Sequence, residues 1–421
     1  MLSAQENDTL TLVGTGTPMG NLIRRYWVPV GMSWEVEPDG SPQRVQLLGE
    51  KLVAFRDTSG RVGLIAEHCP HRGASLWFGR NEQGGLRCVY HGWKYDVSGQ
   101  CIDQMNEPAD ADFSHKVRAT SYPVVEMGGL MWTFMGAPDQ QPPLPKFAWT
   151  QVPTQHRHVN KTYEECNWLQ AMEGGLDTSH VPILHGKLTD DTDLPGVSPS
   201  TPLARGKAPH LEVDETDYGY AYYGVRELEN DQLHVRAYHF VMPFTQIRPE
   251  PFTAVGLVAG HIWVPMDDHH CMVFNWEYAP AGEGMEDPYA VARINGSGLD
   301  DQTPDARKIR NLDNDYLIDR DAQKKYTFTG IFGVNVQDHA VQEGMGPIVD
   351  RSKEHLGPAD KAIIVMRRQL FDAVRTVEDG GDPAGTGDSY YRVAAVDRVI
   401  SASSDFREAL RDEMYPEPIA G

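Results

Sequence analysis

Two short stretches decide the fold of the first half of the chain: CPHRG at residues 69–73 and CVYHGW at residues 88–93. Each stretch carries one cysteine followed, two or three positions later, by one histidine, and sixteen residues separate the first histidine from the second cysteine. This spacing suits a [2Fe–2S] cluster in which two thiolates hold one iron and two imidazoles hold the other. The expected cluster ligands are Cys69, His71, Cys88 and His91.

The same four side chains could instead form a tetrahedral zinc site. Zinc sites with two cysteines and two histidines usually place the cysteines close together and the histidines after them. Here each cysteine is paired with a histidine, and Gly73 and Gly92 each follow a histidine where a loop must turn around a buried cofactor. The pattern therefore favours a cluster of the Rieske type, whose neutral imidazoles raise the reduction potential above that of an all-cysteine ferredoxin.

Composition limits the partners and the compartment. The 421 residues allow two or three domains, and 60 acidic against 38 basic residues disfavour a nucleic-acid partner. Three of the five cysteines lie outside the cluster motif, namely Cys101, Cys166 and Cys271, and we expect them to be buried thiols in a reducing compartment. Because the N-terminus has no leader pattern and no apolar stretch approaches about 18 residues, we expect a cytoplasmic protein without a membrane span.

Turn and strand signals predict four parts. Residues 1–35 are expected to be an N-terminal helical segment, 36–140 a small antiparallel β-domain that carries the cluster loops, 141–155 a proline-rich linker, and 156–421 a second domain. Within the second domain, strand-like alternation is expected at 211–213, 220–225, 233–240 and 271–276, and helical spacing of apolar residues at 363–377. This mixture of strand-like and helical segments is compatible with an α+β fold.

A second metal site is indicated near the start of the second domain. Asp177 and His180 are three residues apart and would share a helix face, whereas His185 would point away from His180 on a regular helix. Pro182 is expected to break the helix between the two histidines and let their rings converge. An isolated pair of histidines is more often two ordinary polar residues, but a redox cluster on the same chain favours a mononuclear iron with two histidines and one carboxylate.

The carboxylate ligand must come from elsewhere in the chain. The candidates are Asp338, Glu343 and Asp350, in and after a segment where a strand-like run is expected to pass into a helix. Asp338 lies at that junction, where a ligand is most rigidly aimed, whereas Glu343 has the position of a helix carboxylate that faces solvent or a nearby cation.

With these motifs the chain resembles the α subunits of the Rieske non-heme iron aromatic-ring-hydroxylating oxygenases, in particular the phthalate-dioxygenase-like branch. The resemblance extends through nearly the whole chain: beyond the cluster loops it includes TPMG at 17–20, Asn167-Trp168, MPF at 242–244 and the segment from Gln337 to Leu356. It implies a small antiparallel β Rieske domain and a catalytic domain with a long antiparallel sheet wrapped around helices. It also supports Asp338 as the iron ligand and implies that Asp177 bridges a cluster histidine and an iron histidine.

The resemblance implies one [2Fe–2S] cluster and one mononuclear Fe(II), O2 as a substrate, and electrons from an NAD(P)H-dependent flavin and [2Fe–2S] reductase. It further implies a homo-oligomer, α3 or α3α3, with no β subunit. The expected reaction is hydroxylation of an aromatic substrate. O-demethylation of an aromatic ether by a monooxygenase uses the same metals and stays open, and a Rieske electron carrier without catalysis is the less favoured alternative.

An anionic substrate is expected, most of all an aromatic carboxylate of the phthalate, chlorobenzoate or phenoxybenzoate type. Arginine recognises carboxylates through its planar fork, and the candidates are Arg226 and Arg236, with Arg205 and Lys207 before them. Each could equally be part of a surface salt bridge. The acid- and proline-rich segment 188–202 is expected to be either a lid over the iron pocket or a passive surface loop.

Overall fold

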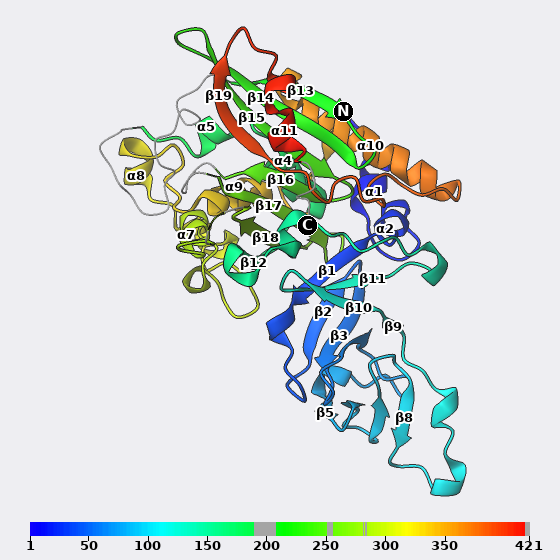
Figure 1. Cartoon of the computed structure of the whole chain (residues 1–421). Coiled ribbons are helices and arrows are strands. Elements are labelled where there is room, and N and C mark those ends of the chain that lie inside the picture. Colours follow the sequence, from blue (N-terminus) through cyan, green and yellow to red (C-terminus); the bar gives the residue numbers. More distant parts are fainter. Residues whose placement is uncertain (189–207, 251–255, 281, 283, 417–421) are drawn as a thin grey trace. The chain divides into compact units, whose positions relative to one another are not determined.

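The computed structural model describes residues 1–188, 208–250, 256–280, 282 and 284–416. The chain divides into two compact units, one formed by Val13–Pro142 and the other by Met1–Leu12 together with Pro143–Gly421. Figure 1 follows the chain through both units. In the described residues no helix is both long enough and apolar enough to cross a membrane.

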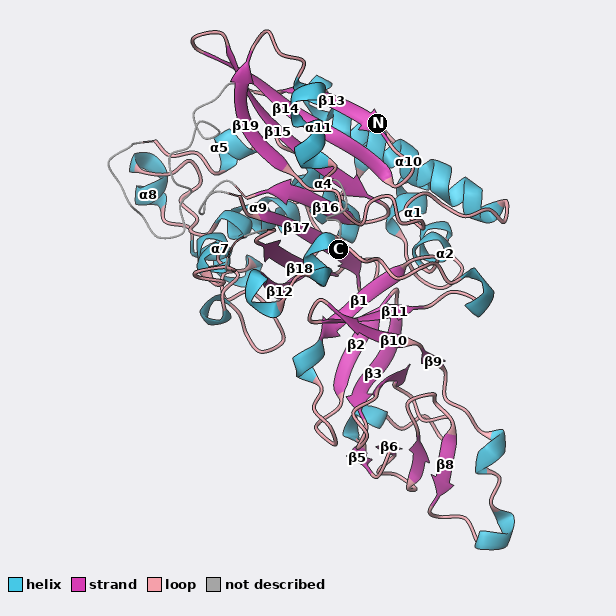
Figure 2. Cartoon of the chain, in the orientation of Figure 1, coloured by secondary structure: helices cyan, strands magenta, loops and turns pink. Residues whose placement is uncertain are grey.

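The first unit, Val13–Pro142, is built from three small antiparallel sheets that follow the short helix α2 (Pro18–Ile23). Figure 2 shows their strands in magenta. In spatial order the sheets consist of β1 (Trp27–Met32), β11 (Leu130–Phe134) and β10 (Val124–Met127); of β2 (Gln43–Leu47), β3 (Glu50–Arg56), β4 (Val62–Ala66) and β9 (Ser121–Tyr122); and of β5 (Arg80–Glu82), β6 (Gly85–Arg87), β7 (Trp93–Tyr95) and β8 (Cys101–Gln104). The small antiparallel β-domain predicted from the sequence is confirmed.

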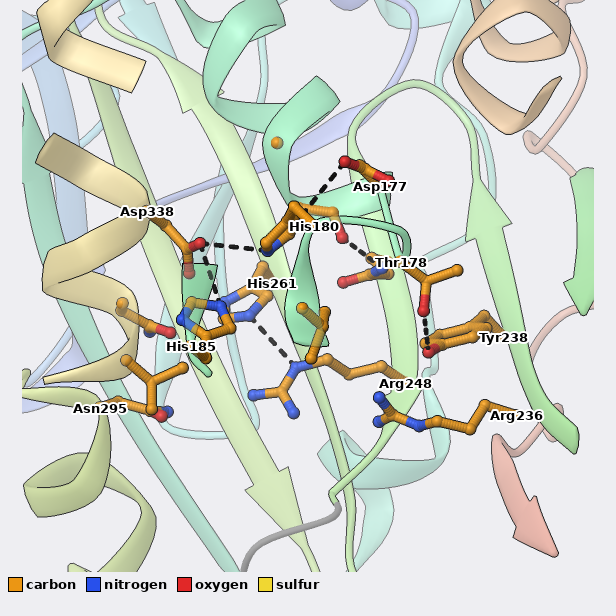
Figure 3. A pocket seen from close by; sticks show the side chains of 16 residues that line it. Asp177, Thr178, His180, His185, Arg236, Tyr238, Arg248, His261, Asn295 and Asp338 are labelled. Carbon is orange, nitrogen blue, oxygen red and sulfur yellow. Dashed lines mark hydrogen bonds and ion pairs between the residues drawn. The ribbon is translucent and has the colours of Figure 1, made fainter. Parts of the chain in front are cut away.

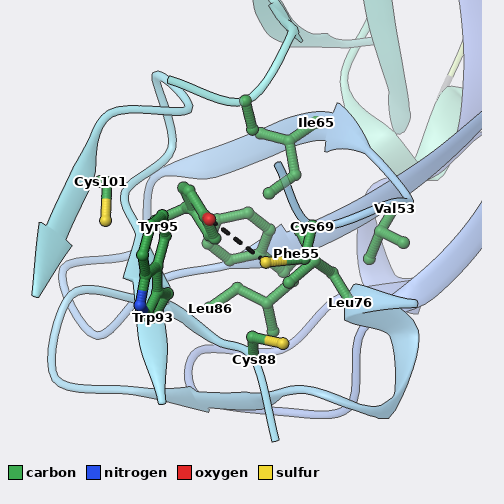
Figure 4. Packing of buried hydrophobic residues seen from close by; sticks show 11 residues of the cluster. Val53, Phe55, Ile65, Cys69, Leu76, Leu86, Cys88, Trp93, Tyr95 and Cys101 are labelled. Carbon is green, nitrogen blue, oxygen red and sulfur yellow. Dashed lines mark hydrogen bonds between the residues drawn. The ribbon is translucent and has the colours of Figure 1, made fainter. Parts of the chain in front are cut away.

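The core of this unit surrounds the two cysteines of the cluster motif (Figure 4). Cys69 and Cys88 are each 2% exposed and pack among buried residues from β3, β4, β6 and β7. Their apolar neighbours are Val53, Phe55, Ile65, Leu76, Leu86, Trp93 and Tyr95. Burying these side chains holds the two motif loops at one end of the unit, since each loop is anchored at its cysteine.

The second unit contains an eight-stranded antiparallel sheet. Its spatial order is β12 (Arg157–Glu164), β18 (Cys271–Tyr278), β17 (Val258–Pro265), β16 (Thr245–Pro249), β15 (Gln232–Val241), β14 (Gly219–Leu228) and β13 (His210–Glu215). The eighth strand, β19 (Val396–Ser401), pairs with the first half of β15, while β16 pairs with its second half. The four strands predicted from alternation correspond to β13, β14, β15 and β18.

Helices cover both faces of this sheet (Figures 1 and 2). On one face α4 (Trp168–Leu176) contacts β17, β18, α9 (Val334–Gly344) and α10 (Lys361–Glu378), and α10 also contacts β13 and β14. On the other face α11 (Phe406–Met414) packs over β14, β15 and β19. The remaining α-helices are α1 (Ala4–Thr11), α3 (Ala148–Gln151), α5 (Val181–Leu184), α7 (Ala290–Asn295) and α8 (Arg320–Lys325). The long sheet wrapped around helices is therefore present.

The structure differs from the expected boundaries in two places. The segment 1–35 is divided: α1 belongs to the second unit, and Trp27–Met32 forms β1, because its Trp-Val-Pro-Val run pairs with the buried strand β11. The proline-rich segment is not a free linker beyond Pro142, since Trp149 is buried and stacks on Trp276 of β18 with 5.4 Å between ring centroids.

Candidate metal centres and substrate pocket

The two loops of the cluster motif share one backbone design. In the first loop the Gly73 amide donates to the Cys69 carbonyl at 2.9 Å, and in the second the Gly92 amide donates to the Cys88 carbonyl, also at 2.9 Å. Both glycines have a φ near +75°, which residues with a Cβ rarely adopt. The loops therefore turn in the same way and present one cysteine and one histidine each.

Their side chains suit a two-iron cluster with one buried and one accessible edge. The two thiols are buried and not in disulfides, whereas His71 and His91 are partly exposed, with 4.6 Å between their ring centroids. The His71 ring stacks on Trp93 at 4.2 Å, which limits its rotation. Tyr95 Oη lies 3.2 Å from Cys69 Sγ (Figure 4) and would donate a hydrogen bond to a thiolate at that position. Cys101, Cys166 and Cys271 are buried free thiols, as expected from the sequence.

The second unit brings His180, His185 and Asp338 together (Figure 3). One ligand atom from each lies within 4.8 Å of the others, and Asp338 Oδ1 is 3.3 Å from Nε2 of both histidines. Two histidines and one carboxylate on one side of an ion leave coordination positions open, which is typical of non-heme Fe(II) oxygenases. The donor set therefore fits a mononuclear iron.

The local backbone around the histidines differs from the expected one. Helix α4 ends at Leu176, so Asp177 and His180 do not share a helix face; they approach across a turn in which Asp177 Oδ1 accepts the Ser179 amide at 2.6 Å. Pro182 does not break a helix but lies in the first turn of the short helix α5, where its missing amide hydrogen costs nothing. His180 and His185 flank this helix, and so both rings can face the same ion.

Asp338 is also held differently from the expectation. The residues just before it do not form the expected strand. Gly333 has a φ of +95° and precedes α9, and Asp338 lies within that helix. The alternating Val334-Asn335-Val336 run is helical because its residues are buried between the sheet and neighbouring helices rather than on a two-sided strand. Helix α4, which leads into the two histidines, packs closely on β17, since a Cβ at Gly175 would lie 2.1 Å from the Trp263 ring.

Each histidine is oriented by a hydrogen bond from the ring nitrogen that faces away from the ion. His180 Nδ1 donates to Asp177 Oδ2 at 3.3 Å, and His185 Nδ1 donates to Gln337 Oε1 at 2.7 Å. Gln337 Nε2 in turn donates to the Ile331 carbonyl at 2.7 Å, which fixes the amide so that its oxygen faces His185. Both rings therefore direct Nε2 at the metal position. The sequence had indicated Asp177 but not Gln337, whose only signal was its place beside Asp338.

The ionisable groups of the metal site shift one another's pKa values. Burial disfavours a charged His180, but its hydrogen bonds to Asp177 and Asp338 outweigh burial and raise its pKa to about 10. Burial would likewise raise the pKa of Asp338, but the two neighbouring imidazoles hold it well below its usual range. A metal ion that binds here would displace the His180 proton and take over the neutralisation of Asp338.

The two other carboxylate candidates lie away from the ion position. Glu343 is 1% exposed and is bound by Lys308 Nζ at 2.8 Å, by the Glu165 amide at 2.9 Å and by the Tyr316 hydroxyl. It has the nearby cation expected from the sequence but does not face solvent. Asp350 caps a 3-10 turn by accepting the Ser352 amide. Of the three candidates, only Asp338 is brought to the histidines.

A cavity opens beside the three metal-site residues (Figure 3). Its polar lining comes from the α4–α5 turn, from α7 and α9, and from strands β15, β16 and β17. The polar and aromatic residues of the lining are Asp177, Thr178, His180, His185, Arg236, Tyr238, Gln246, Arg248, His261, Asn295, Asn335 and Asp338. One cavity therefore joins the metal position to a wall that carries two arginines.

The arginines expected to bind substrate are placed differently. Arg236 lines the cavity, with Nε 3.1 Å from Asp397 Oδ2 and Nη2 donating to the Pro249 carbonyl at 2.8 Å. Arg226 is fully buried and lies behind the lining, where Nη2 donates to the Thr178 carbonyl at 3.1 Å. Arg248, which the sequence analysis did not select, also lines the cavity. Arg205, Lys207 and the expected lid from 189 onward lie outside the described residues.

Comparison with known proteins agrees with both halves of the structure. Residues 26–123 match the Rieske [2Fe-2S] domain, and residues 133–418 match the family described as LigXa C-terminal domain like. The zinc alternative is therefore set aside. The chain belongs to the Rieske non-heme iron oxygenases, as an oxygenase subunit of the phthalate-dioxygenase-like branch that carries one [2Fe–2S] cluster and one mononuclear iron.

Curated relatives match along most of their length. The chain is 40% identical to the 3-chlorobenzoate-3,4-dioxygenase oxygenase subunit of Comamonas testosteroni, over 93% of this chain and 94% of that protein. It is 38% identical to the phthalate 4,5-dioxygenase oxygenase subunit of Pseudomonas putida, over 97% and 94%. It is 33% identical to the 5,5'-dehydrodivanillate O-demethylase oxygenase subunit of Sphingobium sp. (strain NBRC 103272 / SYK-6), over 100% and 90%.

Solved structures show the same fold at lower identity. NdmA of Pseudomonas putida CBB5 with caffeine superposes with a TM-score of 0.59 at 19% identity, covering 92% of this chain and 100% of that one. Dicamba monooxygenase bound to dicamba has a TM-score of 0.59 at 17% identity, covering 85% and 99%. The electron-carrier alternative is set aside, because the relatives are oxygenase subunits.

Proposed function

We propose that this oxygenase subunit hydroxylates an aromatic carboxylate, at an iron held by His180, His185 and Asp338 and with the carboxylate bound by Arg236 and Arg248. The observation that carries the proposal is that the metal-binding set and the two arginines line one cavity. Relatives named for 3-chlorobenzoate and phthalate support the same substrate class.

When bound, the cluster supplies electrons one at a time and the mononuclear iron supplies open positions where dioxygen is reduced beside the substrate. The chain's own residues set the ligands. Asp177 and Gln337 keep the Nδ1 proton on each histidine and so leave the Nε2 lone pairs for the metal. Asp338 contributes one negative charge, which lowers the net charge of the ferrous site to plus one.

The arginine wall would bind the acid group. Two nitrogens of Arg236 and two of Arg248 already contact protein acceptors, so a carboxylate would take a charge-assisted hydrogen bond from the remaining amino group of each arginine. The two arginines are neighbours, since Arg236 Nη2 contacts the carbonyl of Pro249, the residue that follows Arg248. Val181 and Val334 line the same cavity and offer apolar contacts for an aromatic ring. Arg226 would act indirectly, by holding the Thr178 backbone.

Electrons come from a separate redox partner, as in other oxygenase subunits of this family; we propose an NAD(P)H-dependent reductase with flavin and a [2Fe–2S] cluster. We further propose a homotrimer or a pair of stacked trimers without a β subunit. Asp177 is 20% exposed at its side chain and His91 is partly exposed, so Asp177 could join His180 to His91 of a second copy. Electrons would then cross a subunit interface.

O-demethylation of an aromatic ether is a second candidate. One relative, 33% identical over the whole chain, is an O-demethylase oxygenase subunit, and such a reaction would use the same ligands. The two outcomes differ in their products: ring dihydroxylation yields a dihydrodiol, whereas O-demethylation yields a phenol and formaldehyde.

The test uses the holoprotein with a Rieske-system reductase and O2. The probes are 3-chlorobenzoate, phthalate, 4-methoxybenzoate and their neutral amides, with NADH consumption, formaldehyde and ring products measured. We expect at least one acid to stimulate product formation while its amide does not, and Arg248→Gln to raise its KM by about 100-fold, since a hydrogen bond to a charged group is worth about 1.5–3 kcal/mol. Equal turnover of acids and amides, or an unchanged KM in Arg248→Gln, would overturn the carboxylate assignment.

A further inference from the structure

Four polar side chains form a row across adjacent strands beneath the substrate cavity. In the register of the sheet, Gln246 of β16 faces His261 of β17, His261 faces Asn275 of β18, and Asn275 faces Asn160 of β12. Residues directly opposite one another in adjacent strands point to the same face of the sheet. Because Gln246 and His261 line the cavity, the whole row lies on the cavity side of the sheet.

Hydrogen bonds along this row run in one direction. Arg248 Nε donates to His261 Nε2 at 3.3 Å, His261 Nδ1 to Asn275 Oδ1 at 2.7 Å, and Asn275 Nδ2 to Asn160 Oδ1 at 2.8 Å. Asn160 Nδ2 then approaches Ser297 Oγ at 3.4 Å. The amide of Asn275 can orient only one way in this chain of donors, so its oxygen fixes the proton of His261 on Nδ1.

This leaves His261 Nε2 with a free lone pair that faces Arg248. Desolvation by the surrounding protein, and then the Arg248 cation, lower the pKa of His261 to about 3, so the imidazole is neutral at physiological pH. A protonated ring would place two donors against each other. Neutral His261 is therefore an obligate acceptor for the arginine.

Two hydrogen bonds hold the Arg248 guanidinium in place. Nε is bound by His261, and Nη1 donates to Glu250 Oε2 at 2.8 Å. Together these contacts fix the plane of the guanidinium and leave its third nitrogen, Nη2, as the one that we assign to the substrate; Figure 3 shows the Arg248 side chain in the cavity lining. A long arginine side chain without such supports would lose more rotamer entropy on binding a ligand.

We propose that His261 is a positioning residue for substrate specificity: with its acceptor nitrogen set by Asn275, it holds Arg248 in the orientation that receives the substrate carboxylate. This inference rests on the proposed function, because it requires Arg248 to bind the acid. It deepens that proposal by naming the buried side chains that make the arginine a rigid receptor. In this proposal His261 acts through Arg248 and is not assigned to the metal.

The test measures binding of 3-chlorobenzoate and 3-chlorobenzamide to the holoprotein by calorimetry. We expect His261→Leu to raise the Kd of the acid by about tenfold or more and to leave the Kd of the amide within about twofold. His261→Gln keeps an acceptor that Arg248 can reach, and we expect it to restore binding of the acid to within about threefold. The control is His158→Leu, a matched change on β12, where the ring packs on Tyr289 instead; it leaves both values unchanged.

A double-mutant cycle of His261 and Arg248 separates this inference from the proposed function on which it rests. In an Arg248→Gln background, we expect His261→Leu to add less than about twofold, since both changes remove one interaction. If Arg248→Gln alone leaves acid binding intact, the proposed function and this inference fail together. If Arg248→Gln weakens binding but His261→Leu does not, or weakens acid and amide alike, this inference alone is wrong. A crystal structure of His261→Leu with an unmoved Arg248 guanidinium would also overturn it, whatever the ligand.

Discussion

Gln337 provides the sharpest test of the iron site, because the sequence motif contains the ligands but not their support. The Gln337 side chain is buried, and it accepts from His185 Nδ1 at 2.7 Å while donating to the Ile331 carbonyl at 2.7 Å. Gln337→Ala would leave His185 free to rotate and to carry its proton on either nitrogen. It would also remove the shorter of the two hydrogen bonds to the Ile331 carbonyl, which would keep only the Thr329 hydroxyl at 3.5 Å.

The expected losses of metal affinity and of fold stability follow from these two contacts. Loss of the partner that orients a metal-bound histidine costs about 10–100-fold in metal affinity, or about 1.4–2.8 kcal/mol. The lost hydrogen bond to the Ile331 carbonyl adds about 0.5–1.5 kcal/mol of destabilisation to the fold, since the Thr329 hydroxyl still contacts that carbonyl. We therefore expect Gln337→Ala to weaken Fe(II) binding by at least tenfold and to lower the unfolding midpoint. Gln337→Glu keeps an acceptor for His185, and we expect it to bind Fe(II) within a few-fold of the parent.

The assay is selective removal of the mononuclear iron with a chelator, followed by titration with Fe(II) or with Co(II), whose visible bands report ligand geometry. Gln342→Ala is the matched control, because Gln342 is also a buried glutamine of α9 but packs against Gly174 instead of a metal ligand. We expect it to lose stability without losing metal affinity. If Gln337→Ala binds metal like the parent, or if both variants lose affinity equally, the support assigned to Gln337 is refuted.

Three further predictions concern other parts of the chain. Asp177→Asn keeps an oxygen acceptor for His180, so we expect normal iron content but at least tenfold slower reoxidation of the reduced cluster by substrate-bound enzyme in stopped-flow; a parental rate would contradict the bridging role. Tyr95→Phe removes the hydroxyl next to Cys69 Sγ, and redox titration should show a potential lower by about 20–60 mV, because that hydrogen bond stabilises the more negative reduced cluster; a rise would refute this. Burial lowers the pKa of His239 to about 4, against about 6.5 in the unfolded chain. Because only the unfolded state takes up the proton as pH falls through this window, the free energy of unfolding should drop by up to about 3 kcal/mol between pH 6.5 and 4. Denaturant unfolding of His239→Gln should show a smaller drop than the parent.

Most of the proposed metal ligands can be picked out in the sequence because they lie close together along the chain. Cys69 and His71 lie two residues apart, and His180 and His185 lie five apart, so that each pair is visible in one short window. Asp338 required a choice among remote carboxylates, and its neighbour Glu343 differs from it only by facing Lys308 in the folded protein. Resemblance to a family made that choice, and the folded geometry agrees with it.

The substrate wall could not be predicted in the same way. Arg248 is near Arg236 only because β15 and β16 are adjacent, and His261 reaches Arg248 only because β16 and β17 are in register. Such contacts depend on strand pairing, which no short window of sequence reveals. Arg226 and Arg236 have equivalent sequence contexts, on strands that alternate in the same way, yet only Arg236 lines the cavity.

We thus assign metal binding and acid binding to different kinds of secondary structure. The metal ligands come from the α4–α5 turn and α9, which are locked by tight contacts such as that of Gly175 with Trp263. The arginines that we propose to bind the acid come from β15 and β16 and line the same cavity. Replacing Arg236 or Arg248 can therefore alter the charge and shape of the substrate wall while leaving the metal-binding set in place, since neither arginine shares a side-chain hydrogen bond with that set among the described residues. This separation would allow the substrate wall to change independently of the metal site, in a chain whose relatives carry names as different as 3-chlorobenzoate-3,4-dioxygenase and 5,5'-dehydrodivanillate O-demethylase.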